Sequence, residues 1–415
     1  MPAIPGSSAT TPRGGERAAW VMLLALTGGF ALSQAYRTVA AIMAPQLQAD
    51  FGLDPQALGV FAGTFHFAFG ALQLLMGIGI DLYGVRRTVL VAFPLTIAGS
   101  MLSAIADRFG VLLLGQALIG IGCAPAFLAC TIFIAQRFAP QRYASVSGLV
   151  LGLGGLGMLV TGTPLAWLID AWSWRAGFVA LAAFSAFAWL AIAWLVREPD
   201  AAPAAAADER ESIGQALRGF ASLFAMPHTW GILALATVSY ASFVSLRGLW
   251  LGPLLVDRYG FSLVASGIVA VVVSVASMIG PPVFGRLDPG RATRRRWLLV
   301  GTLASAALFA LLALGIGAAF DITISLAYSL LFGYGILQYA DVRDSYPPVL
   351  TGRALSLFTM ALFLGVALMQ WLTGAAASAA VAIGAPPFAA AFGTIAAMLL
   401  LGALLFARLP QPSGD

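Results

Sequence analysis

Long apolar runs recur along almost the whole chain, and they constrain its fold more than any other feature. Each run has roughly 20 residues or more, so as a helix it can cross the ~30 Å hydrocarbon core of a membrane. Backbone polar groups must be satisfied internally in lipid, which favours helices over open strands. The sequence therefore predicts an all-α membrane protein with twelve transmembrane helices, near residues 19–45, 57–80, 88–106, 111–135, 144–169, 176–196, 229–255, 263–287, 297–317, 322–342, 354–378 and 388–408.

The composition excludes most other classes of protein. The chain has 415 residues, of which 60% are hydrophobic and 9% charged, whereas soluble domains carry about 25% charged residues. Its 22 basic residues are all arginines, most of them in short loops, so we predict no nucleic-acid partner. The histidines and cysteines lack metal-site spacing, and we find no ATP-binding loop or nucleophile–base set. We therefore predict no metal, no cofactor and no enzymatic activity, and we expect the lipid bilayer as a partner.

The chain divides into two halves that resemble each other. When the sequence is shifted by 208 residues, the stretch 45–59 aligns with 253–267, and the two share Pro, Leu, Gly, Ala and Gly in register. Parallel six-helix repeats are a known transporter architecture. We predict two pseudo-symmetric six-helix bundles with this division of the chain: a cytoplasmic tail at 1–17, an N-terminal bundle at 18–196, a cytoplasmic linker at 197–228, a C-terminal bundle at 229–408 and a tail at 409–415.

The arginines predict the orientation in the membrane. With the N-terminus inside, seventeen arginines fall in cytoplasmic segments, and only Arg108, Arg175 and Arg258 fall in outer loops. Cytoplasmic loops carry the excess of basic residues in membrane proteins. We therefore expect both termini in the cytoplasm and place the multi-pass protein in the inner membrane of a bacterium.

A polar motif follows the second apolar run, in the sequence Gly77-Ile-Gly-Ile-Asp81-Leu-Tyr-Gly84-Val-Arg86-Arg87. It resembles the G-x-x-x-D-x-x-G-x-[RK]-[RK] signature of the major facilitator superfamily of secondary transporters. It departs from that signature by having Gly in place of the usual Leu two residues before the Asp, and Leu in place of the basic residue after it.

The resemblance implies alternating access between the two halves. It also implies a latch in which the Asp81 carboxylate faces the N-terminus of the eleventh helix and binds Arg86 or Arg142. The alternative is a loop that only sets the topology. The predicted gating residues are Gly77, Asp81, Gly84, Arg86, Arg87 and Arg142.

Two further arginines lie inside predicted helices, Arg37 in the first and Arg247 in the seventh. A guanidinium within the bilayer costs at least ~2.5–3.5 kcal/mol and keeps its proton. Among the acidic residues only Asp341 lies at all deep in an apolar run. The pair therefore predicts a site for a small organic anion, either a carboxylate or a phosphate ester.

Facilitators that exchange organophosphates for phosphate are similar in placing one arginine on each of these two helices. In this chain the two arginines are 210 residues apart rather than 208, and two residues turn a helix by about 200°. Snorkelling to an interface and a helix-packing ion pair are the alternatives for each arginine.

Polar and aromatic residues within other apolar runs extend the predicted substrate site. For each of them the alternative is a hydrogen bond between helices or an interfacial aromatic. An unperturbed histidine titrates near neutral pH, so His66, together with Asp341, is a candidate for proton coupling, and a counter-anion is the other candidate coupled partner. Besides Arg37 and Arg247, the predicted substrate-binding residues are Tyr36, His66, Gln73, Gln116, Tyr240, Trp250, Gln338 and Gln370.

We therefore predict a monomeric secondary transporter of a small organic anion. An exporter of drugs or metabolites is the second interpretation, although Gln116 stands where many proton-coupled members have Arg. Drug antiporters also carry a Gly-Pro dipeptide in the fifth helix, where Thr163 separates the two residues in this chain. A membrane receptor or assembly factor without transport is the third interpretation.

Overall fold

The structure is a computed structural model and describes residues 13–139, 142–197 and 220–410. Within these ranges the chain forms helices and no β-strand, and twelve helical stretches are long and apolar enough to cross a membrane. The prediction of an all-α membrane protein with twelve transmembrane helices is confirmed. Most of the predicted linker and parts of both predicted tails lie outside the described residues.

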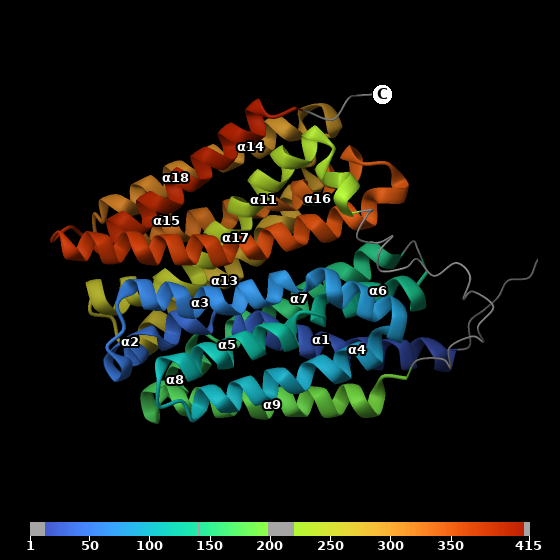
Figure 1. The fold of residues 1–415 in the computed structure, drawn as a ribbon, viewed down its shortest axis with the longest axis horizontal. Helices are drawn as coiled ribbons and strands as arrows, with labels where there is room; N and C mark the ends of the chain where they lie inside the picture. Colours follow the sequence, from blue (N-terminus) through green and yellow to red (C-terminus); the bar gives the residue numbers. More distant parts are fainter. Residues whose placement is uncertain (1–12, 140–141, 198–219, 411–415) are drawn as a thin grey trace, which may run out of the picture.

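The N-terminal half holds the first six spans, which run side by side in the lower part of Figure 1. Several spans consist of two helices in sequence. Its helices are α1 (Arg13–Tyr36), α2 (Val39–Phe51), α3 (Pro55–Ala71), α4 (Gln73–Ala104), α5 (Phe109–Cys123), α6 (Ala126–Arg137), α7 (Tyr143–Val160), α8 (Thr163–Ala171) and α9 (Trp174–Leu195).

The C-terminal half holds the other six spans and begins at Pro227, two residues before the predicted start of the bundle. Its helices are α11 (Pro227–Ser245), η3 (Leu246–Trp250), α12 (Leu251–Pro253), η4 (Leu254–Arg258), α13 (Leu263–Arg286), α14 (Arg291–Leu314), α15 (Ala318–Leu331), η5 (Phe332–Gly335), α16 (Ile336–Ser345), α17 (Pro348–Ala382) and α18 (Pro387–Arg408). Of the short elements, η3 and η4 are π-helical and η5 is a 3-10 turn.

Each half crosses six times, so α1 begins and α18 ends at the same end of the molecule, which we call the terminal end. The opposite end is the distal end. In Figure 1 the helices α14 and α18 tilt away from the N-terminal half towards the terminal end, whereas α17 and α3 lie side by side.

The two halves pack closely in their distal parts because glycines let the backbones approach. A methyl group on Gly59 of α3 would lie 2.3 Å from the backbone oxygen of Gln370 in α17. One on Gly252 of α12 would lie 1.9 Å from the oxygen of Ala41 in α2. Small residues permit such contacts between membrane helices. The distal end of the molecule is therefore closed in this conformation.

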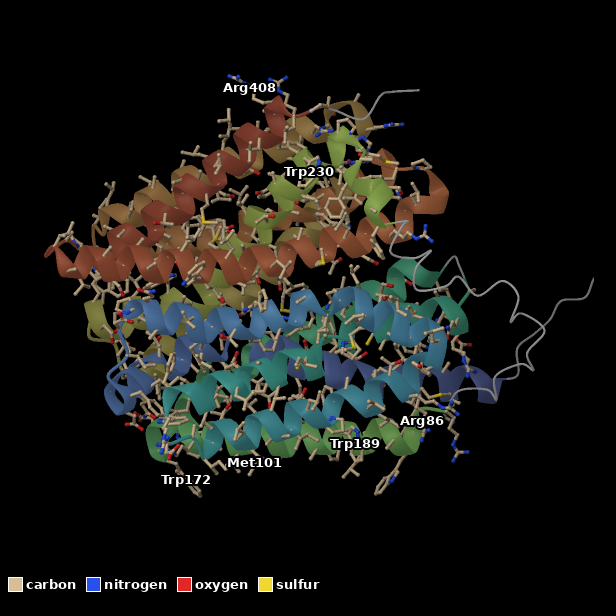
Figure 2. All side chains as sticks on the ribbon, viewed as in Figure 1. Arg86, Met101, Trp172, Trp189, Trp230 and Arg408 are labelled. Atoms are coloured by element: carbon tan, nitrogen blue, oxygen red, sulfur yellow. The ribbon has the colours of Figure 1, made fainter. Side chains whose placement is uncertain are left out.

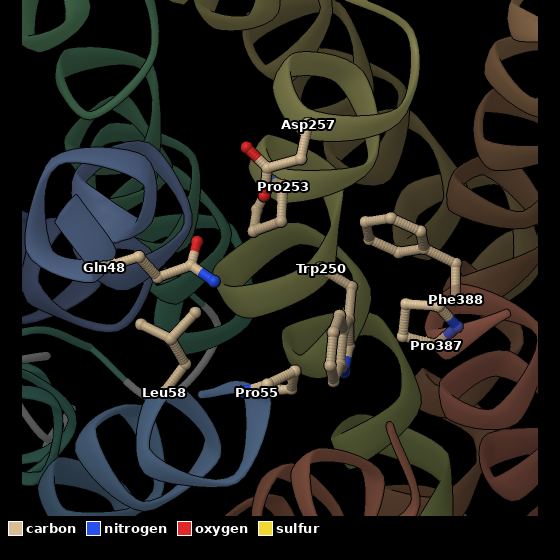
Figure 3. A pocket seen from close by; sticks show the side chains of 8 residues that line it. All are labelled: Gln48, Pro55, Leu58, Trp250, Pro253, Asp257, Pro387 and Phe388. Atoms are coloured by element: carbon tan, nitrogen blue, oxygen red, sulfur yellow. The ribbon is translucent and has the colours of Figure 1, made fainter. Parts of the chain in front are cut away.

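A small cavity of about 130 Å³ remains in this distal closure (Figure 3). Helices from both halves line it, and the Trp250 and Asp257 side chains come from the seventh span. The lining residues are Gln48, Pro55, Leu58, Trp250, Pro253, Asp257, Pro387 and Phe388.

The outer surface of the helices carries apolar and aromatic side chains, as lipid contact requires. Trp172 is 79% exposed near the distal end, and Trp230 is 52% exposed near the terminal end (Figure 2). Tryptophans gather at the two membrane–water interfaces. The protein is thus built to sit across a bilayer.

Candidate functional site

Arg37 lies between the two halves, at a break in the first span. Helix α1 ends at Tyr36 and α2 begins at Val39, which leaves Arg37 in the turn between them. Its guanidinium carbon lies 4.8 Å from the ring centre of Phe69 in α3 and 4.6 Å from that of Phe363 in α17. A cation between two aromatic faces is attracted by both rings. One ring from each half therefore holds this charge.

The Arg37 guanidinium is buried and has no acidic partner. Its side chain is only 7% exposed, and the ion pairs among the described residues involve other arginines. Nη1 donates to the Tyr240 hydroxyl at 3.1 Å and Nη2 to the Ser33 hydroxyl at 3.4 Å, while Nε is buried without a partner. A buried charge with a free donor is expensive unless an anion completes it.

His66 and Gln370 lie in the same seam between α3 and α17. On α3 the flanking glycines Gly63 and Gly70 contact α17, which places His66, on the same helical face, against that helix. His66 is 1% exposed and Gln370 is fully buried. His66 Nε2 and both polar atoms of the Gln370 amide have no hydrogen-bond partner. Arg37, His66 and Gln370 thus form a buried polar cluster, and each of the three side chains has at least one polar atom without a hydrogen-bond partner.

Arg247 is also buried, but protein atoms occupy its donors. Its Nε donates to the Ala270 carbonyl at 3.1 Å and to the Ser274 hydroxyl at 2.9 Å, both in α13. Its Nη2 reaches across to the N-terminal half and donates to the Met158 carbonyl at 3.0 Å. In this conformation Arg247 therefore joins the two halves through backbone oxygens.

The two arginines lie on different backbone conformations, Arg37 in a turn and Arg247 in a π-helical segment. Arg247 lies in η3, and a second π-helical turn, η4, follows. A π-turn has a wider winding than an α-helix and rotates the residues near it relative to a regular helix. Arg37 and Arg247 are 210 residues apart in the sequence, and the helical winding at Arg247 differs from that of an α-helix. The spacing of apolar residues does not reveal this difference.

Three of the predicted site residues in the N-terminal half have no hydrogen bond to the described part of the C-terminal half. The Tyr36 hydroxyl donates to Ser100 at 3.0 Å, inside the N-terminal bundle. The Gln73 amide donates to the Ala124 carbonyl at 3.2 Å. Gln116 is buried in α5 with its amide nitrogen unpartnered. These contacts belong to the N-terminal half, and a substrate role for the three residues stays a prediction.

In the C-terminal half, Tyr240 is the predicted residue that meets Arg37. The Trp250 indole donates to the Thr373 hydroxyl at 3.0 Å. The Gln338 amide oxygen accepts from the Ser239 hydroxyl at 3.1 Å. Only Tyr240 of this group is thus tied to the cluster by a hydrogen bond.

The predicted gate shows a backbone break at its second glycine. Gly84 has φ 85° and ψ 167°, a conformation that side chains rarely adopt, and it kinks α4 close to the start of the third span. Arg86 donates to the Ala193 carbonyl at 2.9 Å, and Arg142 pairs with Glu16. Arg87 is exposed. The side chain of Asp81 lies outside the described part of the chain, so the latch stays a prediction.

The sequence of residues 25–369 matches the profile of the Major Facilitator Superfamily. This match covers well over half of the chain. The chain belongs to the Major Facilitator Superfamily.

Individual relatives agree with this family. The chain is 26% identical to the hexuronate transporter of Bacillus subtilis (strain 168) over 251 residues, which are 59% of this chain and 58% of that protein. It is 30% identical to an MFS-type efflux pump of Mycolicibacterium smegmatis over 305 residues, 69% of this chain and 66% of the pump. These matches span less than two thirds of each relative's length.

A solved structure confirms the fold over nearly the whole facilitator. The crystal structure of the D-xylose–proton symporter superposes with a TM-score of 0.77 over 95% of this chain and 99% of that chain, at 14% identity. At this identity the likeness speaks for the fold alone.

The C-terminal half of this facilitator has an echo of the gate motif in which Arg294 binds two carboxylates. Arg294 in α14 binds Asp288 through two bonds of 3.0 and 2.8 Å, and Asp344 at the end of α16 at 2.6 Å. The hydrogen bonds from Arg294 hold the pKa of the Asp288 carboxyl below its usual value. Asp341 is 7% exposed in the same helix, α16, and its coupling role stays a prediction.

Sequence reasoning missed the aromatic part of the site. Phe69 and Phe363 sit in apolar runs where a phenylalanine is ordinary core material, and Ser33 is one of many small polar residues in the helices. The one available signal was spacing, since Phe69 lies three residues after His66 and therefore on the same helical face.

Proposed function

We propose that this facilitator moves a small organic anion, a carboxylate or a phosphate ester, across the inner membrane of a bacterium. The observation that carries the proposal is Arg37, a buried guanidinium between the two halves with a free donor and no acidic partner among the described residues. An anion supplies the missing counter-charge through charge-assisted hydrogen bonds. The related hexuronate transporter supports a carboxylate, because a hexuronate is a sugar acid.

The proposed cycle is alternating access. The arginine distribution favours a cytoplasmic terminal end, so the closed distal end faces outwards and the described conformation is the one that exchanges substrate with the cytoplasm. When the halves rock, Arg37 separates from Tyr240 or Phe363, since these belong to the opposite half. Arg37 then stays with the N-terminal half and presents the anion to the other side.

In this scheme the Asp81 motif latches the terminal end when that end closes. Gly84 supplies the turn that brings the third span back beside the second. The Asp81 carboxylate then faces the N-terminus of α17, where an anion is favoured by the helix dipole. The coupled partner is a counter-anion or a proton, carried by Asp341 or by His66 in a conformation that opens the histidine to water. The transporter acts as a monomer in this proposal.

The test is uptake of labelled D-glucuronate into proteoliposomes by the wild type and by Arg37→Gln. Loss of the guanidinium removes the charge-assisted bonds, so uptake is expected to fall by about 100-fold. The matched control is Arg408→Gln, which removes an exposed arginine at the end of α18 and should leave uptake unchanged. Normal uptake by Arg37→Gln would show that no anion binds at this residue.

The relative named as an efflux pump favours a second candidate, export of a drug or metabolite. The two functions differ in the charge of the ligand. The exporter is favoured if a lipophilic cation inhibits glucuronate uptake by binding that does not need Arg37. It is also favoured if the Arg37→Gln variant transports such a cation. A wild-type protein that carries only anions excludes cationic drugs as substrates.

A further inference from the structure

The His66 ring has a defined hydrogen-bonding pattern. Its Nδ1 lies 3.0 Å from the Ala62 carbonyl oxygen, one turn earlier in α3. A carbonyl oxygen can only accept a hydrogen bond, so Nδ1 carries the proton and donates it. Nε2, at the other edge of the ring, is buried without a partner.

The surroundings of His66 favour the neutral ring. The guanidinium of Arg37 acts on it electrostatically. Phe65 packs edge-on against the ring, and the face of α3 that carries His66 packs against α17. A second cation beside Arg37, away from water, would be repelled and poorly solvated. A neutral ring protonated on Nδ1 leaves Nε2 as a pure acceptor, which needs an O–H or N–H donor.

The Gln370 side-chain amide offers a hydrogen-bond donor and a hydrogen-bond acceptor close to His66. Its amide lies close enough to the His66 ring across the seam to act on it. The amide oxygen and nitrogen are each buried and unpartnered. A hydroxyl group both donates and accepts, so it matches an acceptor such as Nε2 beside a donor such as the amide N–H.

These atoms lie in one seam and differ in what they can bind. Arg37 offers a charged donor, His66 an uncharged acceptor, and Gln370 one donor and one acceptor. Buried polar groups in folded proteins are nearly always hydrogen-bonded. A plain carboxylate would satisfy Arg37 and leave His66 without a donor, whereas a ligand with hydroxyls satisfies all three side chains.

Resting on the proposed function, we propose that the substrate is a hydroxylated carboxylate, such as a sugar acid. Its carboxylate binds Arg37, one hydroxyl donates to His66 Nε2, and the Gln370 amide binds the same or a neighbouring hydroxyl. Arg37 sets the requirement for charge, and His66 with Gln370 sets the requirement for hydroxyls.

Two matched probes separate these requirements. D-glucuronate carries a ring, a carboxylate and hydroxyls, while cyclohexanecarboxylate keeps the ring and carboxylate and lacks the hydroxyls. Equilibrium affinities are measured for the purified full-length protein and for His66→Phe, which keeps a flat ring without the acceptor. The control is His228→Phe, which alters the other histidine, in the first turn of α11. Gln370→Leu is a second, independent variant.

The wild type is expected to bind D-glucuronate at least about ten-fold more tightly than cyclohexanecarboxylate, the usual effect of one or two well-placed hydrogen bonds. His66→Phe and Gln370→Leu should each lower the glucuronate affinity by about ten-fold and change the cyclohexanecarboxylate affinity by less than about two-fold. His228→Phe should behave as the wild type. A variant that still binds cyclohexanecarboxylate is folded. If His66→Phe is not folded, the affinities of Gln370→Leu for the two probes test the proposal.

Equal affinity of the wild type for the two probes overturns the hydroxyl assignment, and so does an unchanged preference in the variants. If Arg37→Gln still abolishes binding of both probes in that case, the proposed function stands and only the hydroxyl assignment fails. If Arg37→Gln binds both probes normally, the proposed function itself fails.

Discussion

The N-terminal and C-terminal halves each carry a buried arginine on their first span, and the two side chains are held in different ways. Arg37 lies between two aromatic rings with Nε unpartnered. Arg247 donates to the carbonyls of Ala270 and Met158. Both arginines contact the opposite half, and they differ in that Arg37 keeps a buried donor without a partner. This difference is the reason for proposing the anion site at Arg37.

The echo of the gate motif is held by ion pairs within one half. In the echo, Arg294 binds the carboxylates of Asp288 and Asp344, all within the C-terminal half. In the N-terminal motif, Arg86 donates to the Ala193 carbonyl of α9. We infer that the C-terminal motif stabilises its own half, while the latch role of Asp81 stays a proposal.

The largest effect is expected for Arg37→Lys. Lysine keeps the positive charge but replaces the planar fork with a single ammonium, which cannot supply the Nε donor and the Nη contacts together. Uptake of D-glucuronate into proteoliposomes should fall by about 10- to 100-fold. A lysine variant with wild-type uptake would reduce the role of Arg37 to charge alone.

For Arg247→Gln we expect a smaller effect, and one on the distal closure between the halves. Losing the bond to Met158 should weaken the distal closure by about 1–3 kcal/mol. Leu58 is buried at the distal cavity, so Leu58→Cys reports opening when Cys123 and Cys130 are replaced by Ala. Its labelling rate by a membrane-impermeant maleimide should rise by about ten-fold.

The control for this labelling is Arg175→Gln, because Arg175 binds Asp50 and Ala106 within the N-terminal half. Its labelling rate should match that of the reporter alone. Should Arg247→Gln label no faster than this control, Arg247 does not hold the distal closure.

Asp81→Asn should reduce uptake several-fold while membrane insertion and the amount of protein stay unchanged. The amide keeps the shape of the side chain but loses the charge that favours a helix N-terminus, worth about 0.3–2 kcal/mol. The control is Asp107→Asn, an exposed acid beside Arg108 at the distal end. Wild-type uptake by Asp81→Asn would remove the latch from the account.

The smallest effect on transport is expected for Asp288→Asn, with uptake within about two-fold of the wild type. The variant should instead lower the melting temperature, because the pair with buried Arg294 contributes about 1 kcal/mol. The pKa of Asp288 is depressed in the folded protein. The wild type's advantage is therefore complete above the ordinary carboxyl pKa and disappears as the pH falls through the depressed value.

Melting curves of both proteins at neutral and acidic pH test this assignment. A large loss of uptake by Asp288→Asn, equal to that of Asp81→Asn, would mean that the two motifs have the same role.

The fold was predictable from the sequence because lipid imposes one strong requirement, an apolar helix for each crossing. Arg37 and Tyr240 were both among the predicted site residues, but the hydrogen bond between them was not predicted. The Phe69 and Phe363 rings could not be singled out, because a phenylalanine facing a cation and one facing lipid have the same sequence signature. Arg247 lies in a π-helical segment, and such a change of winding rotates side chains without altering the apolar pattern of the sequence.

The most direct test of the central claim is equilibrium binding of D-glucuronate to purified Arg37→Gln and Arg247→Gln, measured side by side with the wild type. The account predicts that Arg37→Gln shows no measurable binding, a loss of about 100-fold or more. It predicts that Arg247→Gln binds within about ten-fold of the wild type, because its contacts are to the protein. Near-normal binding by Arg37→Gln, or complete loss of binding by Arg247→Gln alone, would contradict it.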